Sequence, residues 1–273
     1  RSSAASDVYK RQTDNPYEII KEWIKINNGF EIRYVYKENG GMHTAHNTAY
    51  ENIDTELNVC VDSDDYMPDN AVQLIIDCWN KNKNKDYAGI IALDFADSTK
   101  KVIGKELPTD KESTTLMGYY NNGGFGDKKL IYRTDIIKQT PPYPVFDNEK
   151  YVALAYKYHL IDEKYELKIL NECVCIVDYQ MDGSSTNMYR QYVRNPKGFA
   201  FWRKEQMKHS INTKQKIKAC IHYVSSSLIA KNKHFIKESP EKFLTVLSVP
   251  LGFLLKIIVV KKSKSSYMKV EGI

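Results

Sequence analysis

A cluster of carboxylates follows a short apolar run of the sequence. Residues 57–61 read LNVCV, and Asp62, Ser63, Asp64 and Asp65 come directly after them. The run predicts a strand buried on both faces, and in open α/β sheets ligands bind beyond the carboxyl ends of the strands. Three carboxylates so close together repel one another unless a cation lies among them. Hard divalent ions such as Mg²⁺ or Mn²⁺ prefer oxygen ligands, typically one or two carboxylates together with substrate phosphates.

The same cluster also has a purely structural interpretation. Pro68 is expected to start a helix, and Asp65 or Asp69 is placed to cap its N-terminus. The residue types alone therefore leave two alternatives open, a cation site and an acidic turn that leads into a helix.

The segments around the cluster alternate between helical and strand periodicity. Apolar residues at helical spacing predict a helix from Pro16, and Asp94 ends an apolar run as a second carboxylate in this kind of position. Strands that alternate with helices indicate an α/β fold with a mostly parallel sheet flanked by helices, followed by C-terminal helices. The expected strands are 31–36, 57–61, 87–93, 129–132 and 166–179, and the other expected helices are 42–50, 68–80 and 147–159.

Two motifs in sequence order resemble family 2 glycosyltransferases of the GT-A (nucleotide-diphospho-sugar transferase) fold. They are Glu38–Asn47 (ENGGMHTAHN) and Val59–Tyr66 (VCVDSDDY). In that family an ENGG-type turn leads into a helix, and an apolar strand then delivers a DxD motif that precedes a proline-started helix. The resemblance covers roughly residues 13–198. It implies transfer of a sugar from a nucleotide-sugar donor, with a UDP-sugar favoured, to an acceptor hydroxyl.

The resemblance also assigns roles in the donor site. It implies that Asp62 lies near the nucleoside and that Asp64, with Asp62, binds the Mn²⁺ or Mg²⁺ that bridges the two phosphates. Asp65 is expected outside the direct ligand set. The remaining donor-binding residues implied by family position are Asn39, Gly40, Gly41, His43, His46 and Asn47.

An inverting transfer also needs a general base within reach of the acceptor hydroxyl. In the family an acidic residue opens a helix after the acceptor loop, and the corresponding region here is 145–151 (VFDNEKY). Glu149 is the first candidate for the base and Asp147 the second. The structural alternative is that Asp147 caps a helix and Glu149 favours its positive first turn.

The N-terminal part departs from the family pattern. Residues 1–12 (RSSAASDVYKRQ) show no apolar periodicity and are interpreted as a cloning or assembly scar. The first family strand and its nucleoside-binding loop have no counterpart, so the chain is expected to be a fragment. The expected organisation is a GT-A domain over 13–198 and a basic helical region over 199–273.

Charge is divided unevenly along the chain. Residues 1–195 carry 24 Lys or Arg and 30 Asp or Glu, whereas residues 196–273 carry 16 and 4. This division argues against a uniformly basic nucleic-acid binder. The apolar run 243–260 is interrupted by Pro250, Gly252 and Lys256 and is followed by lysines. It therefore favours helices lying in the interface of an anionic membrane over a transmembrane helix, with a buried C-terminal helix as the alternative.

The sequence thus predicts a metal-dependent, inverting glycosyltransferase at the cytoplasmic face of the cell membrane. Its product is expected in a cell-envelope polysaccharide or glycolipid. Two rivals remain open at this point. One is a non-catalytic, membrane-associated sugar- or nucleotide-binding protein of the same fold, and the other is a sugar-phosphate nucleotidyltransferase.

Overall fold

The computed structural model describes residues 16–26, 28–178, 188–209 and 212–270, and the chain divides into two compact units. Unit 1 comprises the chain up to residue 142 together with 157–179. Unit 2 comprises residues 143–156 and the chain from residue 180 onward. The domain boundary predicted after residue 198 falls inside helix α8 (Pro196–Lys208) of unit 2. The segment 1–12, predicted to be foreign to the fold, lies outside the described residues.

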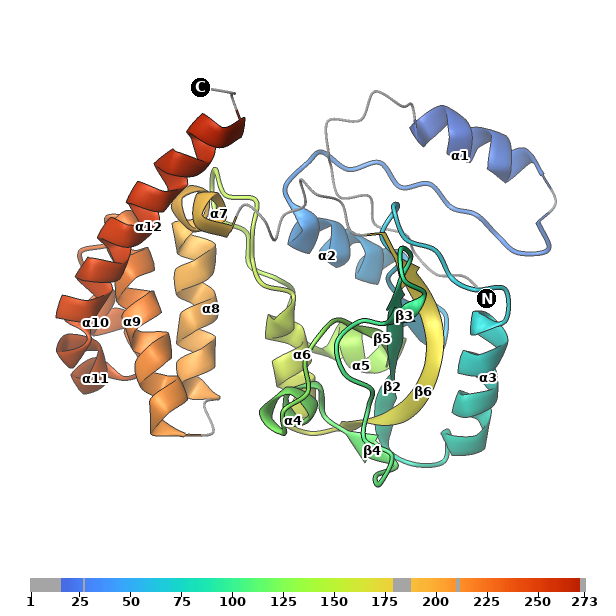
Figure 1. Cartoon of the computed structure of the whole chain (residues 1–273). Coiled ribbons are helices and arrows are strands. Elements are labelled where there is room, and N and C mark those ends of the chain that lie inside the picture. Colours follow the sequence, from blue (N-terminus) through green and yellow to red (C-terminus); the bar gives the residue numbers. More distant parts are fainter. Residues whose placement is uncertain (1–15, 27, 179–187, 210–211, 271–273) are drawn as a thin grey trace. The chain divides into compact units, whose positions relative to one another are not determined.

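Unit 1 is built on one six-stranded mixed sheet (Figure 1). The strand order is β1-β5-β2-β6-β4, and β3 pairs with β2 at the side of this path. The strands are β1 (Leu57–Val59), β2 (Tyr87–Ala96), β3 (Lys101–Val102), β4 (Ser113–Thr114), β5 (Lys128–Arg133) and β6 (Glu166–Val177).

Strand direction decides which strand ends meet. β2 and β6 pair in parallel, whereas β5 lies between β1 and β2 and is antiparallel to both. β1, β2 and β6 therefore all run the same way, and their carboxyl ends lie at one edge of the sheet. The sheet is the mixed form of the predicted α/β architecture, with helices on both faces.

The central strand β2 explains why the sheet has two covered faces. Its residues from Tyr87 to Asp94 are all buried, as expected for the continuous apolar run. Ile90 and Ala92 pack against α3, while Ile91 and Leu93 belong to the core on the opposite face. The helices around this sheet are α1 (Pro16–Lys25), α2 (Met42–Asn52), α3 (Ala71–Asn82), α4 (Leu116–Asn121), α5 (Thr134–Gln139) and α6 (Ala155–Asp162), the last beginning in unit 2.

Two predicted elements are wrong. Residues 31–36, predicted as a strand, have no regular secondary structure, and Val35 and Tyr36 are exposed. No described strand pairs with this segment, and alternating β-formers form a strand only where a partner exists. The helix predicted over 147–159 begins only at Ala155, because Asn148 has a positive φ of 62° and Glu149 and Tyr151 contact α8 instead.

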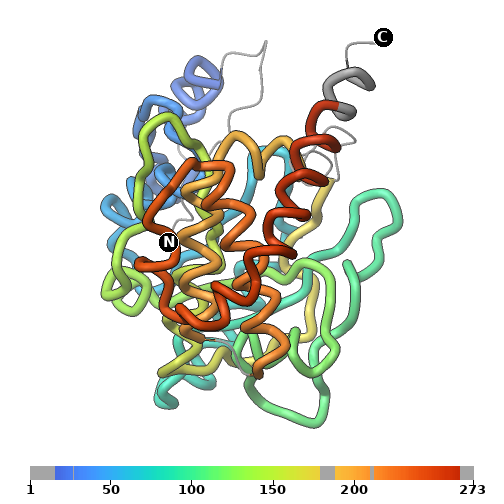
Figure 2. The backbone as a smooth tube through the Cα atoms, turned by 90° about the vertical axis from the view of Figure 1, so that its left-hand side faces the viewer, coloured from blue at the N-terminus to red at the C-terminus, as the bar shows by residue number. Residues whose placement is uncertain are grey.

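Unit 2 is helical, as expected for the C-terminal region. Helix α9 packs against both α8 and α12, and the orange and red tubes of these helices run side by side in Figure 2. The apolar run 243–260 is divided at Ser248, between α11 and α12, whereas the predicted interruptions Pro250, Gly252 and Lys256 all lie within α12. The helices are α7 (Met188–Arg194), α8, α9 (Thr213–Ile229), α10 (Phe235–Glu238), α11 (Lys242–Leu247) and α12 (Val249–Val270). Within the described residues, none of the helices is long and apolar enough to cross a membrane.

Gly89 is required where β2 passes β5. Its φ is +152°, the β2–β6 register shifts beside it, and a Cβ there would lie 1.9 Å from the carbonyl oxygen of Ile131. We expect Gly89→Ala to lower the free energy of unfolding by about 3 kcal/mol or more, because the central strand pair must separate to admit the methyl group.

Gly123→Ala is the matched control for this substitution. Gly123 also has a positive φ, +83°, but nothing lies within 4 Å of its would-be Cβ. Its substitution should cost only about 1–2 kcal/mol, from backbone strain alone. Urea unfolding of both variants measures the difference, and equal losses would contradict the close approach of β2 and β5.

Candidate active site

Carboxylates gather at the edge of unit 1 where β1, β2 and β6 end. Asp62 and Asp64 follow β1, Asp97 follows β2, and Asp178 follows β6. The shared strand direction brings these segments to the same edge, and the side chains of Asp62 and Asp64 are exposed there. The predicted cation-binding residues thus lie at an open, acidic edge of the sheet.

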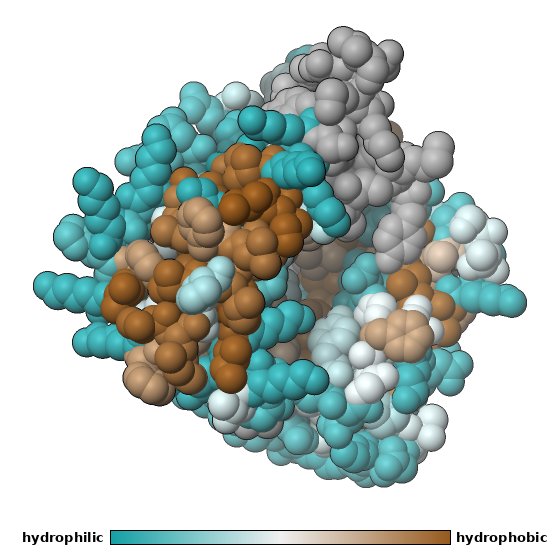
Figure 3. All heavy atoms as spheres, turned by 60° about the vertical axis from the view of Figure 1, so that its left-hand side comes forward, coloured by the Kyte–Doolittle hydropathy of each residue, from teal (hydrophilic) through white to brown (hydrophobic). Residues whose placement is uncertain are grey.

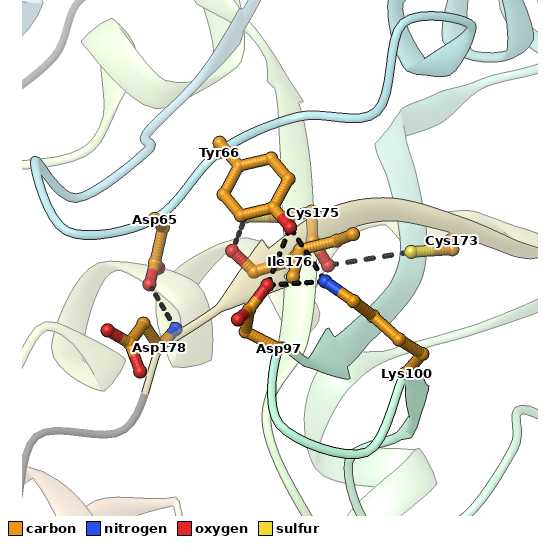
Figure 4. Close-up of polar contacts among 8 residues, drawn as sticks. All are labelled: Asp65, Tyr66, Asp97, Lys100, Cys173, Cys175, Ile176 and Asp178. Carbon is orange, nitrogen blue, oxygen red and sulfur yellow. Dashed lines mark hydrogen bonds and ion pairs between the residues drawn. The ribbon is translucent and has the colours of Figure 1, made fainter.

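The segment that carries Asp62 and Asp64 is held against the end of β6 (Figure 4). The backbone N–H of Tyr66 donates to the carbonyl of Ile176 at 3.0 Å, and the N–H of Ile176 donates back to Tyr66 at 2.7 Å. The N–H of Asp178 also donates to a carboxylate oxygen of Asp65 at 3.2 Å. These bonds fix the position from which the preceding aspartates project.

The side chain of Tyr66 ties the same segment to the β2–β3 hairpin. Its hydroxyl donates to Asp97 at 2.6 Å and accepts from Lys100 Nζ at 2.8 Å (Figure 4). Lys100 also donates to Asp97, and hydrogen bonds from Lys100 and then Tyr66 lower the pKa of the Asp97 carboxyl. Three strand ends are therefore connected through one exposed tyrosine.

A buried ion pair underlies this edge. Lys129 Nζ, at the start of β5, lies 3.7 Å from Asp94 Oδ1, and the two side chains are 12% and 4% exposed. That separation is too long for a hydrogen bond, and Asp94 Oδ1 has no hydrogen-bond partner among the described residues. Asp94 and Lys129 thus compensate each other chiefly through charge.

Burial and neighbouring charges shift the pKa values of both groups in this pair. Burial raises the pKa of Asp94 to about 6, with Lys129 opposing the rise and Asp127 and Asp65 adding to it. Burial by itself would lower the pKa of Lys129, but the Asp94 carboxylate and the Cys175 thiol outweigh it and raise that pKa. Lys129 therefore provides a fixed positive charge beneath the carboxylates of the edge.

The predicted donor-binding turn forms the entry to α2. Gly41 is the N-cap with a φ of +95°, and its N–H donates to the side chain of Asn39 at 3.1 Å. The hydroxyl of Thr44 donates to the carbonyl of Gly41, and a Cβ on Gly40 would lie 2.8 Å from that hydroxyl oxygen. Both glycines are thus needed for the tight turn that leads into α2.

The two predicted histidines of α2 are buried. His43 is 1% exposed, and neither of its ring nitrogens has a hydrogen-bond partner among the described residues. His46 lies 3.1 Å from the hydroxyl of Tyr50 through Nδ1. Burial, with a nearby lysine, lowers the pKa of each histidine to about 4, so both are neutral at pH 7.

A small pocket joins the two motifs found in the sequence. His46, Ala49 and Tyr50 of α2 form one side of it, and Asn58, Val59 and Cys60 form the other. The pocket ends two residues before Asp62. The structure therefore brings the predicted residues of α2 close to the strand that leads into the acidic cluster, while Asn47 lies half-buried on the same helix.

The two candidate bases lie in unit 2. Glu149 is 8% exposed, and its two carboxylate oxygens accept the N–H groups of Lys197 and Gly198 at 2.9 and 2.8 Å. It thereby satisfies the first turn of α8, where backbone donors lack helical partners. Asp147 is exposed. Glu149 therefore has a defined structural contact whether or not it also acts as a base.

The carboxylates at this edge suit a hard cation only if a bound ligand supplies further oxygen atoms. No group of three or more His, Cys, Asp or Glu in the described part of the chain is arranged to hold a metal ion by itself. The exposed carboxylates Asp62 and Asp64 supply hard, charged oxygens, which fits an ion that completes its coordination with phosphate oxygens.

Sequence reasoning missed the residues that support the site. The sequence predicts Lys129 only as part of a strand, predicts no role for Asp97 or Lys100, and contains Tyr66 only as the last residue of the motif Val59–Tyr66. A usable signal was present for Asp97, because it follows an apolar strand as Asp62 does. The pairing of Lys129 with Asp94 depends on β5 lying antiparallel beside β2, which no local pattern shows.

We expect Lys129→Met to lower the free energy of unfolding by about 3–5 kcal/mol at pH 7.5, because the buried Asp94 loses its cation and must either remain charged without it or take up a proton. The raised pKa of Asp94 means that the folded state holds this proton more tightly than the unfolded chain does. Stability therefore falls as pH rises through the folded pKa, and without Lys129 that pKa rises further. The loss should consequently be smaller at pH 5 than at pH 7.5.

Denaturant unfolding at the two pH values measures this effect. Lys101→Met, at an exposed position on β3, is the control and should change little at either pH. The double variant Lys129→Met/Asp94→Asn should lose the extra pH dependence. A loss for Lys129→Met that is the same at both pH values would contradict the charge pairing.

Comparisons with known proteins show what this chain is similar to. A sequence model of Glycosyl transferase family 2 matches residues 11–140. An uncharacterized glycosyltransferase of Rickettsia conorii is 32% identical over 101 residues, which are 35% of this chain and 17% of that protein, so the chain spans about a sixth of this relative's length.

Solved structures extend the likeness to nearly the whole chain. S. aureus TarS 1-349 in complex with UDP-GlcNAc is 14% identical, with a TM-score of 0.56 over 95% of this chain and 80% of that one. S. aureus TarS 1-349 is 15% identical, with a TM-score of 0.50 over 94% and 79%. The likeness at this identity is one of fold. Residues 11–140 thus resemble glycosyl transferase family 2, and the chain has the GT-A fold that its motifs predicted.

Proposed function

We propose that this protein transfers a sugar from a nucleotide-sugar donor to an acceptor hydroxyl. The observation that carries the proposal is the acidic edge, where Asp62 and Asp64 are exposed on a segment fixed by Tyr66. A UDP-sugar is the proposed donor, and the UDP-GlcNAc named with the S. aureus TarS structure supports this choice.

Asp62 and Asp64 are the residues that would hold Mn²⁺ or Mg²⁺ together with the donor phosphates. When bound, such an ion supplies Lewis-acid neutralisation of the charge on the departing nucleoside diphosphate. Their carboxylates suit this role because both are exposed, whereas Asp65 is engaged by the N–H of Asp178. Lys129 and Lys100 limit the repulsion among the carboxylates of the edge.

The start of α2 is the proposed second half of the donor site. Gly40 and Gly41 permit the tight turn, and Asn39 holds it through its side chain. Helix N-termini favour anions because their first N–H groups lack helical partners. The neutral rings of His43 and His46 would contribute hydrogen bonds rather than charge, with Asn47 on the same helix.

We assign the general base to Glu149, with Asp147 as the second candidate. The base would take the proton of the acceptor hydroxyl as its oxygen bonds to the anomeric carbon and the bond to the nucleoside diphosphate breaks, giving inversion. Two N–H groups orient the Glu149 carboxylate. A carboxylate has about four acceptor positions, so capacity for an acceptor hydroxyl remains.

We place the reaction in the synthesis of a cell-envelope polysaccharide or glycolipid, at the cytoplasmic face of the cell membrane. The support is the basic C-terminal region, with 16 Lys or Arg and 4 Asp or Glu over residues 196–273. Basic segments favour the anionic cytoplasmic leaflet.

Asp64→Asn tests the proposed donor site. Calorimetric titration with UDP, with and without Mn²⁺, should show that Mn²⁺ strengthens binding to the parent chain. In the variant this Mn²⁺-dependent gain should fall by about tenfold or more, because the ion loses a charged oxygen ligand. Asp69→Asn, an exposed aspartate at the start of the next helix, is the control and should behave like the parent. Full Mn²⁺-dependent binding by Asp64→Asn would refute the metal assignment.

Glu149→Gln and Asp147→Asn separate the two candidate bases. If Glu149 is the base, Glu149→Gln should reduce the transfer rate about 10²–10⁴-fold while UDP affinity stays unchanged, and Asp147→Asn should remain near the parent. Because Glu149 also holds the start of α8, thermal unfolding is measured in parallel. A large rate loss in Asp147→Asn alone would transfer the role to that residue.

A further inference from the structure

Large apolar side chains are exposed along α11 and α12 of unit 2. Figure 3 shows hydrophobic side chains gathered over these helices, bordered by hydrophilic ones. Their exposed fractions range from 40% to 75%. The apolar face of α11–α12 comprises Phe243, Val246, Leu247, Leu251, Phe253, Leu254, Ile257 and Ile258.

The buried positions of the same helices are mostly small or polar, with Val259 of α12 (4% exposed) and the partly buried Leu244 of α11 as apolar contacts to their own unit. Thr245, Ser248 and Ser263 are 0%, 3% and 4% exposed. Gly252 of α12 packs so closely on α9 that a Cβ would lie 2.5 Å from the side chain of Val224. These helices therefore contact their own unit mainly through small residues and expose most of their large apolar residues, unlike the usual helix in water.

An apolar face of this size is rarely left bare in a protein that acts alone in water. Contiguous exposed apolar patches typically mark a site of contact with a partner or a membrane. The inward side is already well packed, so the outward residues are not needed to complete the core of unit 2. Their exposure is therefore best explained by an apolar partner.

The charge beside this face identifies the kind of partner. Between Lys242 and Val270 the sequence has six lysines and no acidic residue. Three of these lysines, Lys256, Lys261 and Lys264, line a shallow groove together with Ile257 and Val260. Lys256 Nζ lies over the ring of Phe253, 5.9 Å from its centre. The same groove is thus lined both by apolar side chains and by lysines.

We propose that the apolar face of α11–α12 binds the surface of a bilayer that contains anionic phospholipids. The apolar side chains would enter the boundary between headgroups and acyl chains, while the lysines remain at the level of the phosphates. A second copy of this chain is a poorer occupant, because a two-fold symmetric contact would bring the same lysines together. The inference rests on the proposed location of the enzyme at the membrane and names the surface that makes the contact.

Vesicle co-sedimentation of the full chain tests the proposal. The probes are vesicles of phosphatidylcholine alone and of phosphatidylcholine mixed with phosphatidylglycerol. We expect the parent to bind the anionic vesicles at least about tenfold more strongly, and less so at high salt. Leu254→Gln/Ile257→Gln should weaken binding to the anionic vesicles about tenfold or more. Lys261→Gln/Lys264→Gln should weaken it by about tenfold and reduce its salt dependence.

Matched controls come from an exposed part of unit 1. Val72→Gln/Ile76→Gln removes two exposed apolar side chains from α3, and Lys81→Gln/Lys83→Gln removes two exposed charges nearby. Both controls should bind vesicles like the parent. Equal binding by the α12 variants and the parent, or no binding of the parent to anionic vesicles, would overturn the proposal.

Two further measurements separate the remaining explanations. Light scattering after size exclusion reports the oligomeric state. If the parent is a dimer that does not bind vesicles, and Leu254→Gln/Ile257→Gln makes it monomeric, the face belongs to a contact with a second copy. Calorimetric UDP titration of the same variants should match the parent. A parent chain that binds vesicles but does not bind UDP would refute the proposed function without contradicting the membrane contact.

Discussion

The antiparallel insertion of β5 between β1 and β2 is the constraint on which the site depends. Because β5 runs against both neighbours, β1, β2 and β6 all end at one edge of the sheet. Residues that are far apart in the sequence, such as Asp62 and Asp178, are thereby brought to the same edge. The start of β5 lies at this edge too, and this places Lys129 beneath the carboxylates.

The edge combines a rigid base with exposed reactive groups. The buried pair of Asp94 and Lys129 and the contacts of Tyr66 hold the strand ends, whereas Asp62 and Asp64 project into solvent. Carboxylates this close to one another raise the free energy of the fold unless cations compensate them. The protein supplies part of that compensation through lysine, and the proposed metal ion and donor would supply the rest.

Local patterns in the sequence predicted the parts of the site that depend on neighbouring residues. The glycine turn before α2 and the buried strand β2 were confirmed. A strand does precede Asp62, but it is a short edge strand with half-buried Leu57 and Val59, not the predicted strand buried on both faces. The failures involve contacts over long sequence separations. Residues 31–36 have strand composition without a partner strand, and the region of Glu149 contacts the start of α8 instead of forming a helix itself. Neither outcome can be derived from periodicity.

Hydrogen exchange with mass spectrometry can locate the donor site on the chain. The amides of residues 60–66, 96–100 and 176–178 and the start of α2 would be compared with and without UDP and Mn²⁺. The ligand should slow exchange in these segments, which come from three strand ends and one helix, and leave α3 unchanged. Slower exchange confined to other segments, or none at all, would contradict the assignment of the donor site to the acidic edge.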